Sequence, residues 1–152
     1  MSGRSEAQAA MTRATQQVLQ LIPNADGCVV VLVDGDELVE TCRAGSLGPE
    51  QMRLSVNESL SGLSFLSGAS FRCDDAIENP FVDHATAERL SVASFVSVPL
   101  RDGTRAIGAF IAVSRHRAAF NETDVEMLTA NAQSLENELA PRASRVRRFA
   151  SR

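Results

Sequence analysis

The chain has 152 residues, of which 44% are hydrophobic and 22% charged, and its formal net charge is −4. This length suits a single domain with a sizeable core, and the composition is ordinary for a soluble globular protein. The acidic balance argues against a nucleic-acid-binding domain, which is usually basic, and no apolar run is long enough to span a bilayer. The first ten residues lack the apolar core of a signal peptide, so we expect a cytoplasmic location.

A long helix is predicted at each end of the domain, over about residues 4–22 and 122–140. The first is stopped by Pro23, and Asn121 with Asp124 resembles a capping box at the start of the second. In both helices apolar residues recur at alternating spacings of three and four, a pattern typical of a heptad seam that packs on a partner helix. The seam residues are Val18, Leu21, Val125, Leu128, Leu135 and Leu139.

The first hairpin is predicted directly after the N-terminal helix, with Asp34-Gly35 at its turn. A two-residue loop there places Cys28 opposite Thr41, and one further loop residue places it opposite Cys42. The three cysteines of the chain have no metal-ligand spacing. Buried, reduced thiols are therefore expected, and a redox pair of Cys28 and Cys42 is the alternative.

Short elements are predicted between this hairpin and the next. Pro49 suits the first turn of a helix. Ser59 and Asp83 are the expected N-caps of two further helices, because their side chains accept hydrogen bonds from first-turn amides, and Gly68 closes the first of these two. The predicted elements are a helix over about 49–56, a helix over 60–67, a strand over 70–74 and a helix over 84–90.

The central hairpin is predicted from residue 92 to residue 113, where two runs rich in valine, isoleucine and phenylalanine flank Asp102-Gly103. Neither run alternates between apolar and polar residues, which indicates that both faces are covered and that the hairpin lies in the middle of the sheet. The order of elements predicts an α+β domain with one antiparallel sheet. The terminal helices should cover one face, and the segment 49–91 the other.

Several short motifs occur in the chain, and their order and spacing together indicate a known fold. They are Ser61-Gly62 followed by Gly68, Cys73-Asp74-Asp75, Asn79-Pro80-Phe81, Val98-Pro99-Leu100, Asp102-Gly103, Ile107-Gly108, and Phe120 with Asp124. With these motifs, nearly the whole of residues 1–140 resembles a single GAF domain, the small-molecule-binding module of signalling proteins. The resemblance implies a sheet of six strands in roughly the order 2-1-5-4-3, terminal helices that pair in a homodimer, and a ligand pocket under the short helices.

The resemblance also bears on cofactors. Bilin-binding relatives hold their chromophore by a Cys-His pair where this sequence has Asp83-His84, so a covalent bilin is not expected. Cyclic-nucleotide-binding relatives carry an Asn-Lys pair where this chain has Ser114-Arg115, which weakens the cyclic-nucleotide interpretation. Haem ligation by His84 or His116 is an alternative to two exposed surface histidines. The identity of the ligand stays open.

Reductases of free methionine sulfoxide are the enzymatic branch of the family that the sequence resembles, and they need a nucleophilic and a resolving cysteine. The positions of those cysteines carry Ser61 and Glu88 here, and the acidic pocket residues of the reductases fall on Phe95 and Val113. The resemblance therefore implies that this chain is not an enzyme.

The predicted pocket lies among the helix around Phe65, the loop 73–84 and one face of the central hairpin. The hairpin register places either Ser94 or Phe95 opposite Ile111, and the resemblance favours the face that carries Phe95. The candidate ligand-binding residues are Phe65, Asp75, Phe81, His84, Phe95, Ser97, Ile111 and Val113. The alternative interpretation is that the apolar members fill the space as core and that Asp75 caps a turn.

These observations predict a non-enzymatic sensory domain, in which a small molecule favours one packing of the dimer-forming helices and so changes an output module. A ligand-free dimerisation module with a packed pocket, and a thiol-based redox sensor, are the alternatives. Residues 141–152 carry five arginines and no acidic residue, and they are expected to form a basic tail or a linker to the output module.

Overall fold

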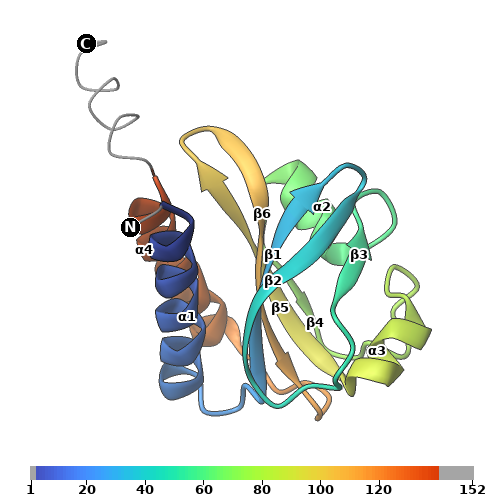
Figure 1. The fold of residues 1–152 in the computed structure, drawn as a ribbon. Coiled ribbons are helices and arrows are strands. Elements are labelled where there is room, and N and C mark those ends of the chain that lie inside the picture. The colour runs from blue at the N-terminus through green and yellow to red at the C-terminus, as the bar shows by residue number, and fades with distance from the viewer. Residues whose placement is uncertain (1–2, 141–152) are drawn as a thin grey trace.

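The computed structural model of the protein describes residues 3–140, and the predicted basic tail over 141–152 lies outside them. Within this range six strands form one antiparallel sheet in the order β3-β2-β1-β6-β5-β4, and four helices cover its two faces (Figure 1). The strands are β1 (Gly27–Asp34), β2 (Glu37–Gly45), β3 (Arg53–Ser55), β4 (Phe71–Cys73), β5 (Ser94–Asp102) and β6 (Arg105–Ser114). The helices are α1 (Gly3–Leu21), α2 (Leu60–Ser67), α3 (His84–Leu90) and α4 (Glu122–Leu139). The predicted α+β class and the implied strand order are confirmed, with β3 as an additional edge strand.

The two long helices lie side by side on one face of the sheet (Figure 1). The predicted capping box at the start of α4 is present, because the side chains of Asn121 and Asp124 each accept the backbone N–H of the other at 2.9 Å. The inner sides of both helices and the strands beneath them form one hydrophobic core around the fully buried Phe110. This continuous, well-packed core holds α1 and α4 against the sheet.

The predicted heptad seam contributes to this core. Val18, Leu128 and Leu135 are fully buried within the single chain. Their interpretation as contacts for a partner helix is therefore wrong, because their surface is already used against the sheet. A spacing of three and four residues equally describes a helix face that covers a sheet. The remaining seam residues are partly buried or exposed: Val125, Leu139 and Leu21.

The central hairpin, β5–β6, occupies the interior of the sheet as predicted, but its register differs. Ser97 lies opposite Ile111, and Phe95 lies opposite Val113. Both predicted registers are wrong, because the turn comes one residue later and a bulge near the end of β5 shifts the pairing further. The pocket face of the hairpin is nevertheless as predicted. Phe95 pairs with Val113 rather than with Ile111, a shift of two residues, and a shift of two leaves each side chain on the same face.

The first hairpin, β1–β2, places Cys28 opposite Ala44 and Cys42 opposite Val30, so both predicted partners of Cys28 are wrong. The two thiols are free and are buried in the core beneath the long helices. Burial, together with the nearby Cys42, raises the pKa of Cys28. Because the thiolate is the reactive form, this environment disfavours thiol chemistry, and the redox-pair alternative gains no support.

A bulge in β2 turns Glu40 and Arg43 to the same face of the sheet. Two N–H groups of the Arg43 guanidinium donate to the two carboxylate oxygens of Glu40, each at 2.7 Å. The guanidinium also donates to the carbonyl oxygens of Gly48 and Glu50, and the N–H of Met52 donates to Glu40 at 2.9 Å. This ion pair therefore holds the segment between β2 and β3 against the sheet.

The helix predicted over residues 49–56 is wrong, since β3 forms there and pairs with β2. Met52 and Val56 are buried and Arg53 is exposed, which is the period-two pattern of a strand. The other short elements follow the prediction. Ser59 and Asp83 cap α2 and α3, and both helices cover the face of the sheet opposite α1 and α4 (Figure 1).

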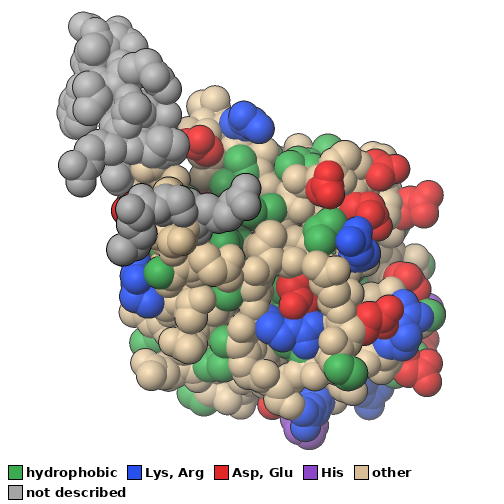
Figure 2. All heavy atoms as spheres, in the orientation of Figure 1, with side chains coloured by type: hydrophobic (Ala, Val, Ile, Leu, Met, Phe, Trp, Pro, Cys, Tyr) green, Lys and Arg blue, Asp and Glu red, His purple; other side chains and the backbone are tan. Residues whose placement is uncertain are grey.

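The molecular surface carries a concentration of acidic side chains around the turn between β1 and β2 and near β3 (Figure 2). Asp34, Asp36 and Glu58 are exposed in this region. The N–H of Val56 donates to the carbonyl oxygen of Asp36 at 2.9 Å, which brings the start of α2 close to that turn. None of the helices within residues 3–140 is both long enough and apolar enough to cross a membrane.

Candidate functional site

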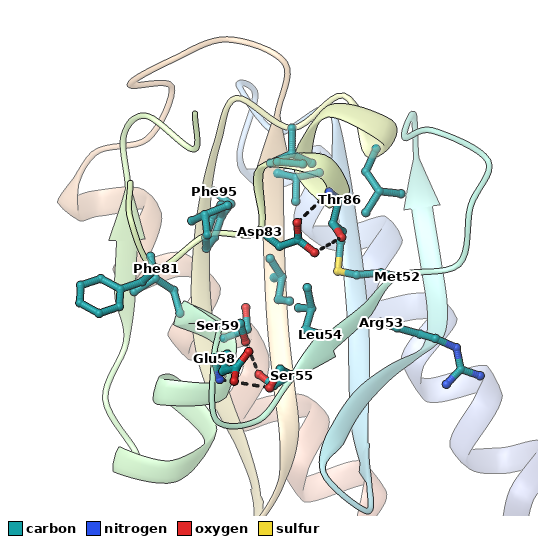
Figure 3. A pocket seen from close by; sticks show the side chains of 18 of the residues that line it. Met52, Arg53, Leu54, Ser55, Glu58, Ser59, Phe81, Asp83, Thr86 and Phe95 are labelled. Carbon is teal, nitrogen blue, oxygen red and sulfur yellow. Dashed lines mark hydrogen bonds between the residues drawn. The ribbon is translucent and has the colours of Figure 1, made fainter. Parts of the chain in front are cut away.

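A cavity of about 300 Å³ opens between the sheet and the short elements that follow β2. Phe95, Ile111 and Val113 from β5 and β6 line it on the sheet side, and Met52 and Leu54 line it at β3 (Figure 3). Residues at the start of α2 and along α3 complete the enclosure. The volume and the apolar lining are those of a small-molecule site at the lower end of the usual size range.

The first turn of α2 lies at this cavity. The Ser59 hydroxyl accepts the N–H of Gly62 at 2.9 Å and donates to the carbonyl oxygen of Ser55 at 2.6 Å. Gly62 packs directly on the backbone carbonyls of Ser55 and Val56, where an added Cβ would clash. This glycine therefore allows the helix to start against the β3 side of the cavity, and Ser61, which is 3% exposed, becomes part of the lining.

Polar groups are concentrated at the two ends of the cavity. Asp83 and Thr86 lie at one end, and Glu58 and Ser59 lie at the other (Figure 3). The Thr86 hydroxyl donates to the Asp83 carboxylate at 2.8 Å. This hydrogen bond, together with those from two backbone amides of α3, holds the pKa of Asp83 below its ordinary value. The carboxylate is therefore ionised and already engaged as the helix cap.

No basic side chain points into the cavity from the described part of the chain. Arg53 is among the lining residues, but its guanidinium pairs with Glu37 at 3.0 Å and points away from the cavity (Figure 3). The charged groups at the ends, Glu58 and Asp83, are acidic. Because an anion buried without a partner is costly, the site suits a neutral and largely apolar molecule.

Half of the predicted ligand-binding residues line the cavity. They are Phe81, Phe95, Ile111 and Val113. Phe95, Ile111 and Val113 are buried on the sheet side, as the face assignment of the hairpin predicted. Phe81 differs from them, since it is 66% exposed and its ring points outward at the rim (Figure 3).

The other half lie outside the cavity: Phe65, Asp75, His84 and Ser97. Phe65 is about one helical turn further along α2, where it packs against the core on this side of the sheet. Asp75 accepts two backbone N–H groups of its own loop, which is the turn-capping alternative. His84 is exposed, and its ring bonds to a loop carbonyl oxygen. The sequence carried no signal for which turn of α2 meets the cavity.

The sequence predicted α2 as a wall of the pocket, but it missed the lining contributed by β3, by α3 and by the first turn of α2. Met52 and Leu54 were assigned to a helix, although their alternation with polar neighbours indicates a strand. Ala87 and Leu90 of α3 are spaced three residues apart, which is the available signal for one buried face of a short helix. Ser61 entered as part of the Ser61-Gly62 motif and as a position where related reductases hold a cysteine, but not as a lining residue.

A family model described as GAF domain matches residues 5–139. The chain belongs to the GAF domain family. The resemblance seen in the sequence is thereby confirmed, and the match covers almost the whole described domain. A sequence search of curated proteins gives no match.

Solved structures similar to this GAF domain include GAF domains of other proteins and a reductase. The blue-light absorbing form of the PixJ GAF domain from Thermosynechococcus elongatus is 16% identical, with 99% of this chain and 95% of that chain covered and a TM-score of 0.79. Free methionine-R-sulfoxide reductase from Neisseria meningitidis, in complex with its substrate, is 26% identical, with 88% and 77% covered and a TM-score of 0.75. The GAF-B domain of DevS from Mycobacterium smegmatis is 24% identical, with 94% and 98% covered and a TM-score of 0.72.

The cavity of this GAF domain does not fit the cofactors considered from the sequence. No described cysteine or histidine lines it, so it offers neither a thiol for a bilin nor an axial ligand for haem. It also presents no cation to the phosphate of a cyclic nucleotide, since the guanidinium of Arg53 points away. Across residues 3–140, no three or more His, Cys, Asp or Glu side chains are grouped so as to hold a metal ion.

Ser97 is fully buried, and its hydroxyl has no hydrogen-bond partner among the described residues. We expect Ser97→Ala to leave the free energy of unfolding unchanged or to raise it by about 1 kcal/mol, because the substitution removes an unpaired buried polar group. Ser64→Ala is the matched control. The Ser64 hydroxyl donates to the carbonyl oxygen of Ala69 at 2.6 Å, so its loss should cost about 1–2 kcal/mol. Urea denaturation measures both, and a larger loss for Ser97→Ala would contradict the expectation.

Proposed function

We propose that this GAF domain is a non-enzymatic sensory or regulatory module that binds a small, neutral and largely apolar molecule in the cavity over β5 and β6. The cavity itself carries the proposal, since it combines about 300 Å³ of space, an apolar lining and polar groups at its ends. Its volume also argues against the alternative in which the pocket is packed shut and the domain serves only for dimerisation.

The reductase among the similar structures raises catalysis as a second candidate. Reduction by thiols needs a cysteine thiolate that attacks and a second cysteine that resolves the product. Ser61 and Glu88 occupy the positions where the reductases hold those residues, and none of the described cysteines lines the cavity. Cys73 lies in the core next to the cavity, and burial raises its pKa, which disfavours the thiolate. These observations favour binding over catalysis.

Hydrogen bonds connect the cavity side of the sheet with α4. The Arg101 guanidinium donates to the carbonyl oxygen of Gly68 at the end of α2, at 2.7 Å. The backbone N–H of Arg101 donates to the Glu136 carboxylate of α4, also at 2.7 Å. A ligand that displaces α2 would therefore act on the position of α4. Such a ligand alters an output only if it binds one arrangement of the helices more tightly than another.

The homodimer, the downstream output module and the cytoplasmic location stay predictions. The exposed surfaces of α1 and α4 are polar, with Gln16, Gln20, Gln133 and Glu138 among the exposed residues. A dimer that uses this face would therefore have a largely polar interface, with Leu21 as an exposed apolar contact.

Filling the cavity tests the proposed function. Ala87 of α3 is buried in the cavity lining, whereas Ala85 of the same helix is exposed. A screen of small neutral metabolites by thermal denaturation should find a ligand that raises Tm by about 5–10 °C at a hundred times its Kd. Ala87→Leu should abolish this increase because the added side chain occupies the cavity, and Ala85→Leu should retain it.

Two results would count against the proposal. An equal increase of Tm in both alanine variants would place the binding site elsewhere. Thiol-dependent turnover of free methionine sulfoxide by the wild-type protein would contradict the non-enzymatic role, and it is measured by following loss of the sulfoxide in the presence of dithiothreitol.

A further inference from the structure

The hydroxyl groups that line the cavity differ in whether the protein already uses them. Those of Ser55, Ser59 and Thr86 take part in hydrogen bonds with neighbouring backbone or side-chain groups. Ser61 also lines the cavity and is only 3% exposed, but its hydroxyl bonds to no described residue. Among residues 3–140 the fully buried side-chain group that lacks a partner is the Ser97 hydroxyl, and the Ser61 hydroxyl is not such a group. The Ser61 hydroxyl therefore keeps accessible surface at the cavity, where it can donate a hydrogen bond to a bound molecule.

Backbone donors lie next to this hydroxyl. Ser61 and Leu60 belong to the first turn of α2, where a helix has no acceptor of its own for the N–H groups. The cap provided by Ser59 satisfies the N–H of Gly62, and the N–H of Leu63 bonds to the carbonyl oxygen of Ser59. The N–H groups of Leu60 and Ser61 have no acceptor within the helix, so the Ser61 hydroxyl lies at the positive end of the helix dipole.

The surrounding charges restrict what these donors can bind. Glu58 directly precedes the cap of α2 and lines the same end of the cavity, and Asp83 lies at the other end. The guanidinium of Arg53 is turned away toward Glu37. A carboxylate or phosphate would therefore meet acidic neighbours without a compensating cation. A neutral oxygen acceptor meets the donors without that cost.

We propose that the ligand of this cavity is a neutral carbonyl compound. Its carbonyl oxygen accepts a hydrogen bond from the Ser61 hydroxyl at the start of α2. Its apolar body lies against Phe95, Ile111 and Val113 on the sheet side. This inference rests on the proposed function, and it adds the chemical class of the ligand and the residue that selects it.

Three probes of similar shape test the inference: acetophenone, ethylbenzene and benzoate. Each is titrated into the full chain, and binding is followed by the NMR shifts of the backbone amides at residues 60–62 and of the methyl groups of Ile111 and Val113. Acetophenone should bind about fivefold more tightly than ethylbenzene, the factor expected for one hydrogen bond, and more tightly than benzoate.

Two serine variants of α2 distinguish the loss of the hydrogen bond to the ligand from a loss of protein stability. Ser61→Ala should reduce the preference for acetophenone over ethylbenzene to less than about twofold, because the donor is lost. Ser64→Ala is the matched control, since the Ser64 hydroxyl donates to Ala69 and lies outside the cavity lining. This variant should retain the fivefold preference even though it is less stable.

The outcomes distinguish this inference from the proposed function. Equal binding of the three probes, tighter binding of benzoate, or an unchanged preference in Ser61→Ala would overturn the carbonyl assignment and leave the cavity as a binding site. If none of the probes shifts the methyl resonances of the cavity, the binding site of the proposed function is wrong, and the inference fails with it.

Discussion

Replacing Leu128 by alanine is expected to lower the free energy of unfolding by about 3–4 kcal/mol and Tm by roughly 10 °C. The Leu128 side chain is fully buried between α4 and the sheet. Its truncation removes apolar surface from the core and leaves a cavity that the packed helices cannot fill. Urea denaturation followed by circular dichroism measures the loss. Sedimentation equilibrium should show the same oligomeric state as the wild-type protein.

Leu21→Ala is the control for this experiment, because Leu21 is 39% exposed on α1 and should cost less than about 1 kcal/mol. Both leucines were assigned from the sequence to heptad seams that contact a partner helix, Leu21 on the N-terminal helix and Leu128 on the C-terminal helix. A Leu128→Ala protein that keeps its stability but dissociates from a dimer would restore the interpretation of Leu128 as an interface residue.

Replacing Arg43 by methionine is expected to lower the free energy of unfolding by about 3 kcal/mol. The side chains of Arg43 and Glu40 are only 24% and 12% exposed, so the substitution leaves the Glu40 carboxylate largely buried without its partner. It also frees the carbonyl oxygens of Gly48 and Glu50 from their donor. Urea denaturation at pH 7 measures the effect. Arg53→Met is the matched control, since the Arg53–Glu37 pair is 53% and 45% exposed and should contribute less than about 1 kcal/mol.

The Arg43–Glu40 ion pair also makes the free energy of unfolding depend on pH, and the direction of this dependence can be predicted. Burial alone raises the pKa of Glu40, but the hydrogen bonds from Arg43 and from the N–H of Met52 outweigh it and hold the pKa below its ordinary value of 4.5. The unfolded chain therefore takes up a proton at higher pH than the folded chain. The stabilisation that Glu40 contributes is therefore complete when the pH is above the ordinary pKa of the carboxyl group. It is lost as the pH falls through the lowered pKa of the folded protein. Between pH 6 and pH 4 the wild-type protein should lose more stability than Arg43→Met, and an equal loss would remove Glu40 as the cause.

The elements that depend on local chemistry could be predicted from the sequence. Ser59, Asp83 and Asn121 satisfy first-turn amides close to themselves in the chain, and each caps the helix expected of it. The unbroken apolar runs of the central hairpin likewise required cover on both faces, and the hairpin lies inside the sheet. Helix caps and continuous apolar runs depend on residues that lie close together in the chain, so a single sequence is enough to predict them.

The features that depend on distant contacts could not be predicted. In both hairpins the turn falls one residue later than the Asp-Gly pair indicates, and a bulge shifts the pairing by one residue more. Neither feature leaves a local signature, and each changes every pairing beyond it. The turn of α2 that meets the cavity is set by the contact of Gly62 with the backbone of residues 55 and 56, which no periodicity reveals. For the same reason Phe65 was assigned to the pocket, and Ser61 was not.

Side chains of the central strands point alternately to the two faces of the sheet, and this alternation affects how such a domain can diversify. In β1 the side chain of Val30 packs beneath the long helices, whereas that of Val31 belongs to the core on the cavity side, and Phe110 and Ile111 of β6 divide in the same way. Adjacent side chains of a strand face opposite sides, so substitutions on one side reshape the binding chamber without touching the other. Descendants of one ancestral sequence can therefore acquire new chemical preferences at alternate positions, while the intervening positions pass on an unchanged scaffold.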